Sequence, residues 1–529
     1  MKRVGIAVIF PALFAVAAVF AQSTGAGPTP GQLTPRDLAL PTLTRAQMLE
    51  DFDALVKIVR DVMPTVAANK AVYGFDVFEG LARYRARIPS VRSTAEFVLL
   101  LDAAINSCKA SHFNADSTTV AAFKSQEWLR GYAEGFVTEA ALEKNEKYMV
   151  VLKQARQRTP LNIPLFYLDG SYYVRHDFTF AGKAYARGSR VVSCNNRQPA
   201  QIVADNADTI AMLPWDFAHR QFYSTSFFSY PGVAQDGRLT FVFQPAEGAP
   251  ITASFPADAK VAFEAPARTT DRQVAYLETS AVVYIRVPSM NPADTPFYTA
   301  RIAEEGKGRK VNAAVIDIRG NGGGSDTVWR QILEALVASD VKFRETMAIR
   351  NTELARRYVA RTGSDFAEHA AVRRIPFLGN EEFAVVDNDF ALTPASDSLR
   401  VPVVYVITNS VFSAAGSLTT VARLAAPIVS VGLRNPYILG RGINPFHFSL
   451  PQSGFTFQIE PVVDLTGASK AEDVFHTAVE VEIKPTLGEM LAFHNEKQEN
   501  LEDFLTNHDP FFRRVLTLLS ARQTARWPL

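Results

Sequence analysis

The chain has 529 residues, of which 47% are hydrophobic and 21% are charged, and its formal net charge is +1 at pH 7. The length suggests about three domains with ample material to bury a core, and the composition is ordinary for a globular protein. A nearly neutral chain gives no reason to expect a nucleic acid or an acidic surface as its partner.

Residues 1–21 predict a secretory signal peptide. Two basic residues precede an apolar run, and the small residue Ala21 marks a cleavage site before Gln22. A retained membrane anchor is the alternative, but the run is short for a bilayer span, and no later segment is apolar for long enough. We therefore expect an exported protein, periplasmic or secreted, without a membrane span after processing.

Residues 22–43 are rich in Gly, Pro, Thr and Ser, which predicts a flexible lead-in. From residue 44 to residue 118, apolar residues recur at helical spacing in three stripes, and this pattern predicts an N-terminal helical domain. The domain ends in a turn that contains Ser111 and His112. By composition alone this turn is unremarkable.

Residues 146–263 predict a β-rich domain, because short apolar and aromatic runs, the first at 148–152, are separated by Gly, Asn and Asp. The chain has two cysteines, Cys108 before this region and Cys194 within it. Export permits a disulfide between them, but two cysteines cannot establish one.

Residues 271–490 alternate between strand and helix patterns, which predicts an α/β domain. Within it, residues 341–399 are charged, irregular and longer than a normal connection, so we expect them to form a lid or a flap. Residues 491–529 predict amphipathic C-terminal helices.

A short apolar run at 402–408 predicts a buried strand, which leads through a small-residue turn into an amphipathic helix. Ser413 stands at the helix end of this turn, where free N–H groups and the helix dipole stabilise negative charge. The N–H of Ala414 can help to hold an oxyanion there, so Ser413 is a candidate acyl-transfer nucleophile. The alternative is that Ser413 only caps the helix.

A second buried strand ends at Asp317 and leads through three consecutive glycines into a helix at 327–337. Glycines permit φ > 0 and let backbone amides converge on an anion. Residues 320–325 also approximate a dinucleotide-binding fingerprint. Against that alternative, the last position is Ser, and Asp340 follows a helix instead of ending a second strand.

Together the two stretches resemble the S41 family of serine peptidases. The family includes the tail-specific (C-terminal) processing proteases and a tricorn-core and interphotoreceptor-retinoid-binding-protein-like branch. Its pattern Asp-x-Arg-x-Asn-x-Gly-Gly is present in full as Asp317-Ile-Arg319-Gly-Asn321-Gly-Gly323-Gly324. Its nucleophile pattern Ser-Ala-(Ser/Ala)-Glu is present as Ser413-Ala-Ala-Gly416, without the Glu.

The resemblance implies an α/β fold with a crotonase/ClpP-like ββα catalytic core, an N-terminal helical domain and a β-rich, PDZ-like middle domain. The PDZ part depends on residues 188–199, which are similar to the Gly-Asp-x-Ile-Leu-x-Val-Asn-Gly stretch of PDZ domains. Ser189 replaces the Asp of that stretch, and no clear carboxylate-binding loop is present, so a plain β domain is the alternative.

The tail-specific proteases use a Ser-Lys dyad, but this chain has no Lys between Lys342 and Lys470, so that mechanism would require Lys470 to reach the site from far along the chain. The tricorn-like arrangement of Ser, His, a second Ser and an acid remains open. In that branch a His at the end of the N-terminal helical region reaches the active site. The resemblance then implies Ser413 as nucleophile, His112 as base, Ser111 as second serine, Glu472 as acid with Asp473 or Glu480 as alternates, and the amides of Gly323, Gly324 and Ala414 as the oxyanion site.

We therefore expect an exported serine-type peptidase that hydrolyses protein or peptide substrates. No metal or organic cofactor is implied, because the eight histidines are scattered without paired ligand spacing. The alternative is a non-catalytic S41-like protein that binds peptides or apolar ligands. The substrate and the oligomeric state stay open.

Overall fold

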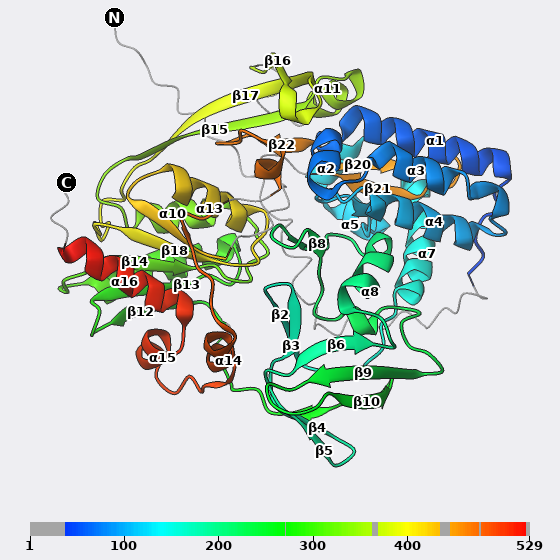
Figure 1. Ribbon diagram of the computed structural model, residues 1–529. Helices are drawn as coiled ribbons and strands as arrows, with labels where there is room; N and C mark the ends of the chain where they lie inside the picture. Colours follow the sequence, from blue (N-terminus) through cyan, green and yellow to red (C-terminus); the bar gives the residue numbers. More distant parts are fainter. Residues whose placement is uncertain (1–37, 270, 362–368, 434–444, 476–477, 525–529) are drawn as a thin grey trace, which may run out of the picture.

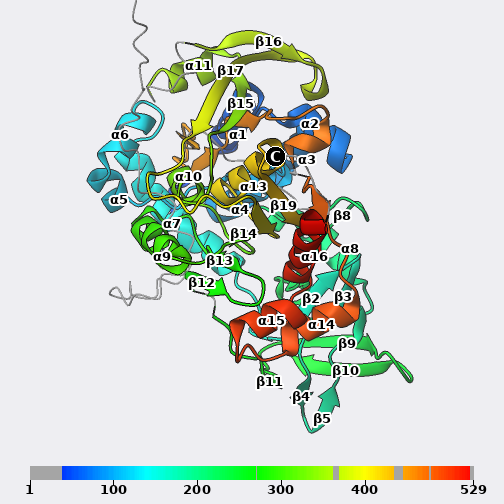
Figure 2. The same cartoon turned by 90° about the vertical axis from the view of Figure 1, so that its left-hand side faces the viewer.

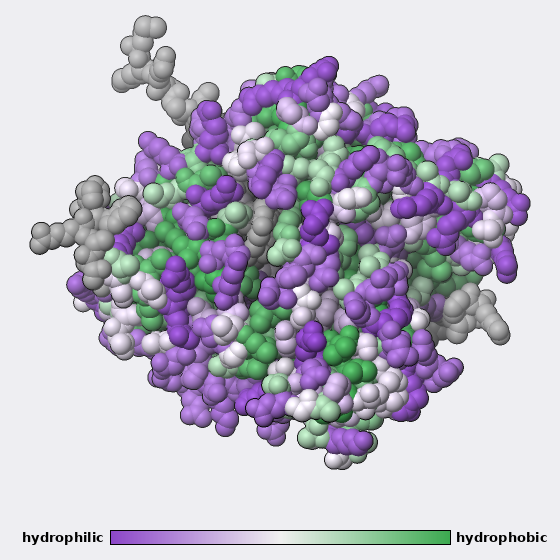
Figure 3. Space-filling model, viewed as in Figure 1, coloured by the Kyte–Doolittle hydropathy of each residue, from purple (hydrophilic) through white to green (hydrophobic). Residues whose placement is uncertain are grey.

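The computed structural model describes residues 38–269, 271–361, 369–433, 445–475 and 478–524, so the predicted signal peptide lies outside the described residues. The described chain combines helices with several separate sheets (Figure 1). In this view the N-terminal helices lie at the upper right, the β-rich region lies below them, and a six-stranded sheet with its helices lies at the left. Hydrophilic residues cover most of this face, with hydrophobic residues scattered between them (Figure 3).

Four helices form the N-terminal region, where the sequence predicted three helical stripes. The first helix begins after Thr44, which forms a reciprocal capping box with Gln47. Buried apolar residues recur along the helices and pack into one core, as the stripes predicted. The helices are α1 (Arg45–Val62), α2 (Val66–Tyr73), α3 (Val77–Arg85) and α4 (Thr94–Ser107).

Helix α7 (Glu139–Ala155) occupies the place of the first strand that we predicted in the β-rich region, at residues 148–152. Thr138 caps the helix by accepting a hydrogen bond from a first-turn N–H. Buried residues recur every three or four positions from Ala141 to Leu152, which is the period of a helix face. A five-residue apolar run looks the same in a strand and in a buried helix, and the strand prediction was therefore wrong.

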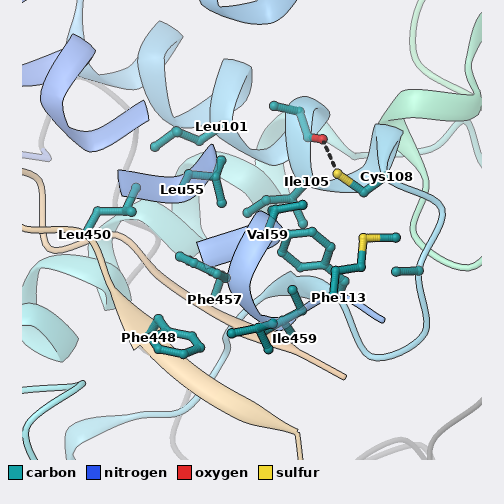
Figure 4. Packing of buried hydrophobic residues seen from close by; sticks show 14 of the residues in the cluster. Leu55, Val59, Leu101, Ile105, Cys108, Phe113, Phe448, Leu450, Phe457 and Ile459 are labelled. Carbon is teal, nitrogen blue, oxygen red and sulfur yellow. Dashed lines mark hydrogen bonds between the residues drawn. The ribbon is translucent and has the colours of Figure 1, made fainter. Parts of the chain in front are cut away.

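A small antiparallel sheet with the order β1-β21-β20 packs against α4 and α7. Its strands are β1 (Asn114–Ala115), β20 (Phe446–Ser449) and β21 (Thr456–Ile459). Aromatic and aliphatic side chains of these strands meet the inner faces of the N-terminal helices (Figure 4). The residues labelled there include Leu55, Val59, Leu101, Ile105, Phe113, Phe448, Phe457 and Ile459. The core thus joins chain segments that are more than three hundred residues apart.

The middle region contains a five-stranded antiparallel sheet with the order β10-β9-β6-β3-β2. Buried side chains alternate along β9, as expected for a sheet with one face on a core. Its elements are β2 (Leu165–Leu168), β3 (Ser171–Val174), β6 (Arg190–Cys194), α8 (Pro199–Asp205), β9 (Arg238–Gln244) and β10 (Ile251–Pro256). Cys108 and Cys194 are both free and buried, so they form no disulfide with each other.

A six-stranded sheet with the order β12-β13-β14-β18-β19-β23 forms the third unit, and all neighbouring strands from β13 to β23 are parallel. Its strands are β12 (Gln273–Leu277), β13 (Val282–Arg286), β14 (Ala313–Asp317), β18 (Val404–Thr408), β19 (Ile428–Gly432) and β23 (Val481–Glu482). One face packs against α9 (Thr295–Gly306), α10 (Asp326–Glu334) and α13 (Ala414–Leu424). The other face packs against α15 (Leu501–Asn507) and α16 (Pro510–Thr524).

Residues 341–399, which we expected to form a lid or a flap, are more regular than predicted. They form a long antiparallel hairpin that lies at the top of the molecule in both views (Figures 1 and 2). Its sheet has the order β16-β17-β15-β22, and β22 comes from beyond residue 460. The elements are β15 (Val341–Arg350), α11 (Glu353–Val359), β16 (Ala371–Ile375), β17 (Glu381–Leu392) and β22 (Val462–Asp464).

Shorter elements complete the described chain. They are α5 (Val120–Ser125), α6 (Glu127–Ala133), β4 (Phe178–Phe180), β5 (Lys183–Tyr185), β7 (Trp215–Asp216), β8 (Gln221–Phe222), β11 (Ala262–Phe263) and α14 (Leu487–Asn495). Within the described residues, no helix combines the length and the apolar character that crossing a bilayer requires.

Asn145 on α7 clamps the two strands of the small sheet, and its replacement tests that role. Its amide donates to the Asp116 carbonyl at 2.6 Å and its oxygen accepts the Thr456 N–H at 3.0 Å, both inside the core. We expect Asn145→Ala to lower the free energy of unfolding by about 2 to 4 kcal/mol, because two buried polar groups lose this partner. Thermal unfolding measures the loss, and the exposed Lys153→Ala on the same helix should change stability by less than about 0.5 kcal/mol.

Candidate active site

Ser413 occupies the turn between β18 and α13 in a backbone conformation that is rare for a non-glycine residue. Its φ is 53° and its ψ is −126°. Such a conformation is strained, and in proteins it is concentrated at functional sites. The Ser413 side chain makes no capping hydrogen bond to the helix. The geometry therefore does not support the interpretation that this serine only caps α13.

Asn321 ties the glycine turn to the nucleophile turn. Its side chain is fully buried, donates to the Val287 carbonyl at 2.9 Å and accepts the Gly323 N–H at 2.8 Å. Its backbone carbonyl accepts the Phe412 N–H at 3.0 Å. One asparagine thus fixes the positions of both the glycines and the residue before Ser413.

Gly323 and Gly324 lie where only glycine fits. Their φ values are 96° and 140°, which side chains rarely adopt. A Cβ on Gly323 would lie 2.6 Å from the Cβ of Ser413, and a Cβ on Gly324 would lie 2.2 Å from the Met290 carbonyl oxygen. The structure therefore brings the glycine motif and the predicted nucleophile into direct contact, although Gly323 and Ser413 are 90 positions apart in the sequence.

The oxyanion site differs in one respect from the prediction. The Gly323 N–H is occupied by the side chain of Asn321, so it is directed at this oxygen and not at a substrate. Within the described part of the chain, the N–H groups of Gly324 and Ala414 make no hydrogen bond. These two amides are the remaining candidates for binding a developing oxyanion.

His112 meets an acid because of the register between β1 and β21. Asn114 pairs with Gln458 and Ala115 with Phe457 in an antiparallel ladder. Continuing this register by two residues sets His112 opposite Glu460, since each step back on one strand is a step forward on the other. The His112 Nδ1 and Glu460 Oε2 atoms are 2.9 Å apart, and the Ser111 Oγ lies 3.3 Å from the same nitrogen.

The Glu460 carboxylate is almost fully buried, with 4% of the residue exposed. Burial raises its pKa, while the hydrogen bond and the charge of His112 oppose that shift. Its second oxygen accepts the Val462 N–H at 3.2 Å, which fixes the orientation of the carboxylate. Among the residues that the structure describes, the titratable partner of Glu460 is His112.

The His112 ring lies against the residue that precedes the nucleophile. The centroids of the His112 and Phe412 rings are 4.8 Å apart at an interplanar angle of 52°. Since Nδ1 faces Glu460, Nε2 is the ring nitrogen on the opposite side, which a serine proton would use. The structure thus places His112, Ser111, Ser413 and both glycines in one neighbourhood.

The acids that we predicted for the site have other partners. Glu472 pairs with Lys470 at 2.9 Å in an exposed segment. Asp473 accepts the Ser469 N–H, and Glu480 accepts the Ser430 N–H on β19. Glu460 occupies the place beside His112 that we had assigned to Glu472, which corrects that prediction. Lys470 belongs to the same exposed pair, which gives no support to a Ser-Lys dyad.

Sequence reasoning missed Glu460 because the pairing that brings it to His112 joins segments 348 positions apart. The signal that could have found it is its position directly after the strand at 456–459, because residues at strand ends often line sites. Glu472 and Asp473, by contrast, were predicted as the site acid only because of the family resemblance.

Asp317 and Arg319 of the glycine motif form a buried charge network behind the site. Arg319 bridges Asp317 and Asp509, at 2.5 Å and 2.7 Å, and the Tyr284 hydroxyl donates to Asp317 at 2.7 Å. Burial opposes ionisation of Asp317, but the charge and hydrogen bonds of Arg319 outweigh it and lower the Asp317 pKa to about 2. These residues hold the end of β14 in place and do not face the nucleophile turn.

Among the described residues, no group of three or more His, Cys, Asp or Glu is placed to hold a metal ion. The polar groups that converge near Ser413 are instead a histidine, a carboxylate and backbone amides. Serine hydrolases use a similar set of groups, namely a serine at a helix start, backbone amides and a histidine paired with a carboxylate.

Comparison with known proteins agrees with this class. Residues 281–480, which contain the six-stranded sheet from β13 and both turns, match the model of peptidase family S41. This part of the chain is therefore similar to an S41 peptidase domain, in agreement with the resemblance that the two sequence motifs indicated. No curated protein matches the chain.

The fold is similar to that of CPAF in three solved structures. Mature CPAF is 12% identical with a TM-score of 0.55, over 91% of this chain and 99% of that chain. CPAF complexed with lactacystin is 11% identical with a TM-score of 0.54, over 90% and 99% of the two chains. A CPAF mutant is 11% identical with a TM-score of 0.56, over 92% and 99%. At this identity the likeness shows a mixed α/β, multi-domain fold like that of an S41 protease.

The close approach of Gly323 to Ser413 can be tested with two neighbouring glycines. In Gly323→Ala the new methyl group would overlap the Ser413 Cβ and the Phe412 carbonyl oxygen, so the nucleophile turn must move. We expect hydrolysis to fall at least a hundredfold, because a displacement of about 1 Å can cost that much. Rates are measured with an unfolded protein substrate.

Gly322→Ala is the matched control, because a Cβ there would have no heavy atom within 4 Å. Its activity should stay within a few-fold of the parent. Equal rates for the two variants would show that the contact between Gly323 and Ser413 is not needed for the site.

Proposed function

We propose that this protein is an exported serine-type peptidase that cleaves peptide bonds through Ser413, His112 and Glu460. The observation that supports this most is that two separate sheets bring their functional side chains together. The buried His112–Glu460 pair comes from the small sheet, while the strained Ser413 turn comes from the six-stranded sheet, and Phe412 joins them. These groups lie far apart in the sequence, and only the fold brings them together.

In the proposed mechanism, the Ser413 Oγ attacks the carbonyl carbon of the peptide bond. His112 Nε2 takes the hydroxyl proton, while its Nδ1–H donates to Glu460. The amides of Gly324 and Ala414 stabilise the negative oxygen of the tetrahedral intermediate. His112 then protonates the leaving amine, and an acyl-enzyme forms.

Hydrolysis of the acyl-enzyme uses the same groups. A water molecule gives a proton to His112 and attacks the ester carbonyl, and the collapse of the second tetrahedral intermediate returns that proton to Ser413. The Ser111 hydroxyl, 3.3 Å from His112 Nδ1, adds a second polar contact that keeps the ring in one orientation. We propose this orienting role for Ser111 in place of a direct part in the chemistry.

Glu460 bears on the alternative of a non-catalytic binding protein. The chain lacks the Lys of the Ser-Lys dyad, and Gly416 replaces the acid of the family's nucleophile pattern; these two losses were the reasons to consider a protein without activity. A buried carboxylate hydrogen-bonded to His112 supplies an acid from a different element. The chain therefore has a complete set of groups for acyl transfer, which favours the enzyme.

The finer description of the fold is part of the proposal. We infer a crotonase/ClpP-like core in residues 271–490 and a PDZ-like character for residues 146–263. In the middle region, β6 lies within the stretch that is similar to PDZ domains, and α8 begins at the last residue of that stretch. The free edges of the five-stranded sheet are β10 and β2, and an extended peptide can add to a sheet edge as a further strand.

Three variants test the mechanism. Ser413→Ala and His112→Gln should each lower turnover on the order of a millionfold, because they remove the nucleophile and the base. Glu460→Gln keeps an acceptor for His112 but loses the charge, so we expect a loss of about a hundredfold to ten-thousandfold. Cleavage of an unfolded protein substrate is the measurement.

Glu472→Gln is the matched control for Glu460→Gln and should leave turnover within a few-fold of the parent. The stability of Glu460→Gln is also informative. Burial raises the pKa of the Glu460 carboxyl group in the folded state, so folding loses stability as the pH rises from the unfolded-state pKa through the higher folded-state pKa. At neutral pH a neutral Gln avoids that cost, and the variant should unfold at the same temperature as the parent or higher. Loss of activity in Glu472→Gln, with none in Glu460→Gln, would contradict the assignment.

We also propose that the protein is exported to the periplasm or secreted after cleavage behind Ala21. The support is the sequence pattern of residues 1–21 alone, which lie outside the described residues. Mass spectrometry of protein recovered from a bacterial host should find a mature chain that begins at Gln22. A mature protein that retains Met1 would refute the proposal.

A further inference from the structure

The turn that carries His112, residues 108–113, is held at two ends. At one end His112 contacts Glu460. Within the turn, Lys109 and His112 both have a positive φ, of 49° and 44°, which costs energy for residues with side chains. Such a turn keeps its shape only when its surroundings hold it.

The other end of the turn is anchored to the middle region through Lys109. Its ammonium group pairs with Asp208 at 3.0 Å and donates to the carbonyl of Ala207. It also lies 5.6 Å from the ring centroid of Phe222 on β8. All three contacts are made by residues 207–222, which belong to the middle region. Only 7% of the Lys109 side chain is exposed.

Asp208 also accepts a hydrogen bond from Tyr84 on α3, at 2.8 Å. This carboxylate therefore joins two parts of the N-terminal region, the α3 helix and the His112 turn, to one point on the middle region. Cys108, next to Lys109, is fixed as well, because its carbonyl accepts the Asn69 amide at 2.5 Å. Figure 4 shows the Cys108 thiol bonded to a carbonyl of α4, directly beside the packed core.

An aromatic cluster forms the apolar part of the same junction. Tyr73 at the end of α2 lies 5.0 Å from Trp215 and 5.4 Å from Phe222, measured between ring centroids. Phe475 closes the cluster at 4.9 Å from Tyr73. Burial of such rings supplies most of the binding energy between elements. The polar contacts of Lys109 then determine how the turn sits on this junction.

A buried lysine is an unusual choice for stability alone. Burial lowers the pKa of the Lys109 ammonium, and the charge of Asp208 raises it only in part. A buried ion pair adds little net stability, because desolvation offsets the attraction, but it fixes geometry. Asp208 is 43% exposed, so the pair is also open to solvent at one side. The burial of Lys109 is therefore better explained by a role in fixing the position of the His112 turn than by a contribution to stability.

We propose that Lys109 is a positioning residue for the peptidase site. It fixes the His112 turn to the middle region, so that the docking of residues 207–222 on the N-terminal helices sets the alignment of His112 with Ser413. This inference depends on the proposed function, since His112 is taken to be the base. It gives the middle region a part in forming the site, in addition to any contact with substrate.

Lys109→Met tests the proposal, because Met has a similar volume and leaves no buried charge. We expect kcat to fall at least tenfold with KM within about threefold, since the base is misaligned while substrate binding is kept. Asp208→Asn should reduce kcat in the same way. The double variant should lose no more than the worse single variant, because both changes break one contact. Arg197→Met, which removes an exposed ion pair with Asp205 in the same region, should match the parent.

A second readout separates this inference from the proposed function. In protein with isotopically labelled histidines, the NMR signal of His112, assigned by its absence in His112→Gln, should shift in Lys109→Met and stay unchanged in Arg197→Met. If the parent protein hydrolyses nothing, the proposed function fails, but the shift still tests the coupling.

Parent-like kcat and an unshifted His112 signal in Lys109→Met would overturn the proposal. A loss of kcat that follows only the folded fraction, measured by circular dichroism, with the His112 signal unshifted, would do the same. If Lys109→Met does not fold, the same two measurements on Asp208→Asn decide.

Discussion

The pairing of β1 with β21 is the contact on which the candidate site depends. It consists of two residue pairs, and its register alone sets His112 opposite Glu460. A shift of one strand by one residue would put these two side chains on opposite faces of the sheet. So short a strand cannot stand by itself, and its stability comes from its surroundings. The packed core of Figure 4 and the clamp of Asn145 supply that support.

The two halves of the site were predictable to different degrees, for a physical reason. Ser413 and the glycine turn lie at the carboxyl ends of the neighbouring parallel strands β18 and β14. Each half of that arrangement is a local strand–turn–helix pattern, and adjacent parallel strands bring their ends together. Sequence periodicity therefore found both turns. The His112–Glu460 pair depends on a ladder between distant segments, and no local pattern records its register. The family resemblance pointed to His112, but it led to Glu472 where the structure has Glu460.

The prediction of three oxyanion amides failed at Gly323 for a related reason. Glycine in a turn shows that the backbone must approach something closely, but it does not show which N–H is free. Asn321 uses the Gly323 N–H to hold the turn, while its carbonyl binds the nucleophile turn. The misassigned strand at 148–152 is a similar case, because an apolar run reports burial and leaves the backbone conformation open. In both cases the sequence correctly indicated a close backbone approach or a buried segment. It did not indicate which hydrogen bonds the backbone makes there, and these bonds determine the local structure.

The two buried acids near the site show how the same residue class serves two purposes. Asp317 is surrounded by Arg319, Arg286 and the Tyr284 hydroxyl, and these partners lower its pKa to about 2 although burial opposes them. A carboxylate that is ionised at every relevant pH can hold a strand end but cannot exchange a proton. Burial raises the pKa of Glu460, and its titratable partner in the described part of the chain is a histidine, whose hydrogen bond and charge oppose that shift. A network of cations and a hydroxyl group fixes the sheet that presents Ser413, whereas Glu460 is paired with the single histidine that contacts the residue before Ser413. The two carboxylates thus differ in the number of cations around them, and both sheets contribute to the candidate site, because the large sheet presents Ser413 and the small sheet presents His112 and Glu460.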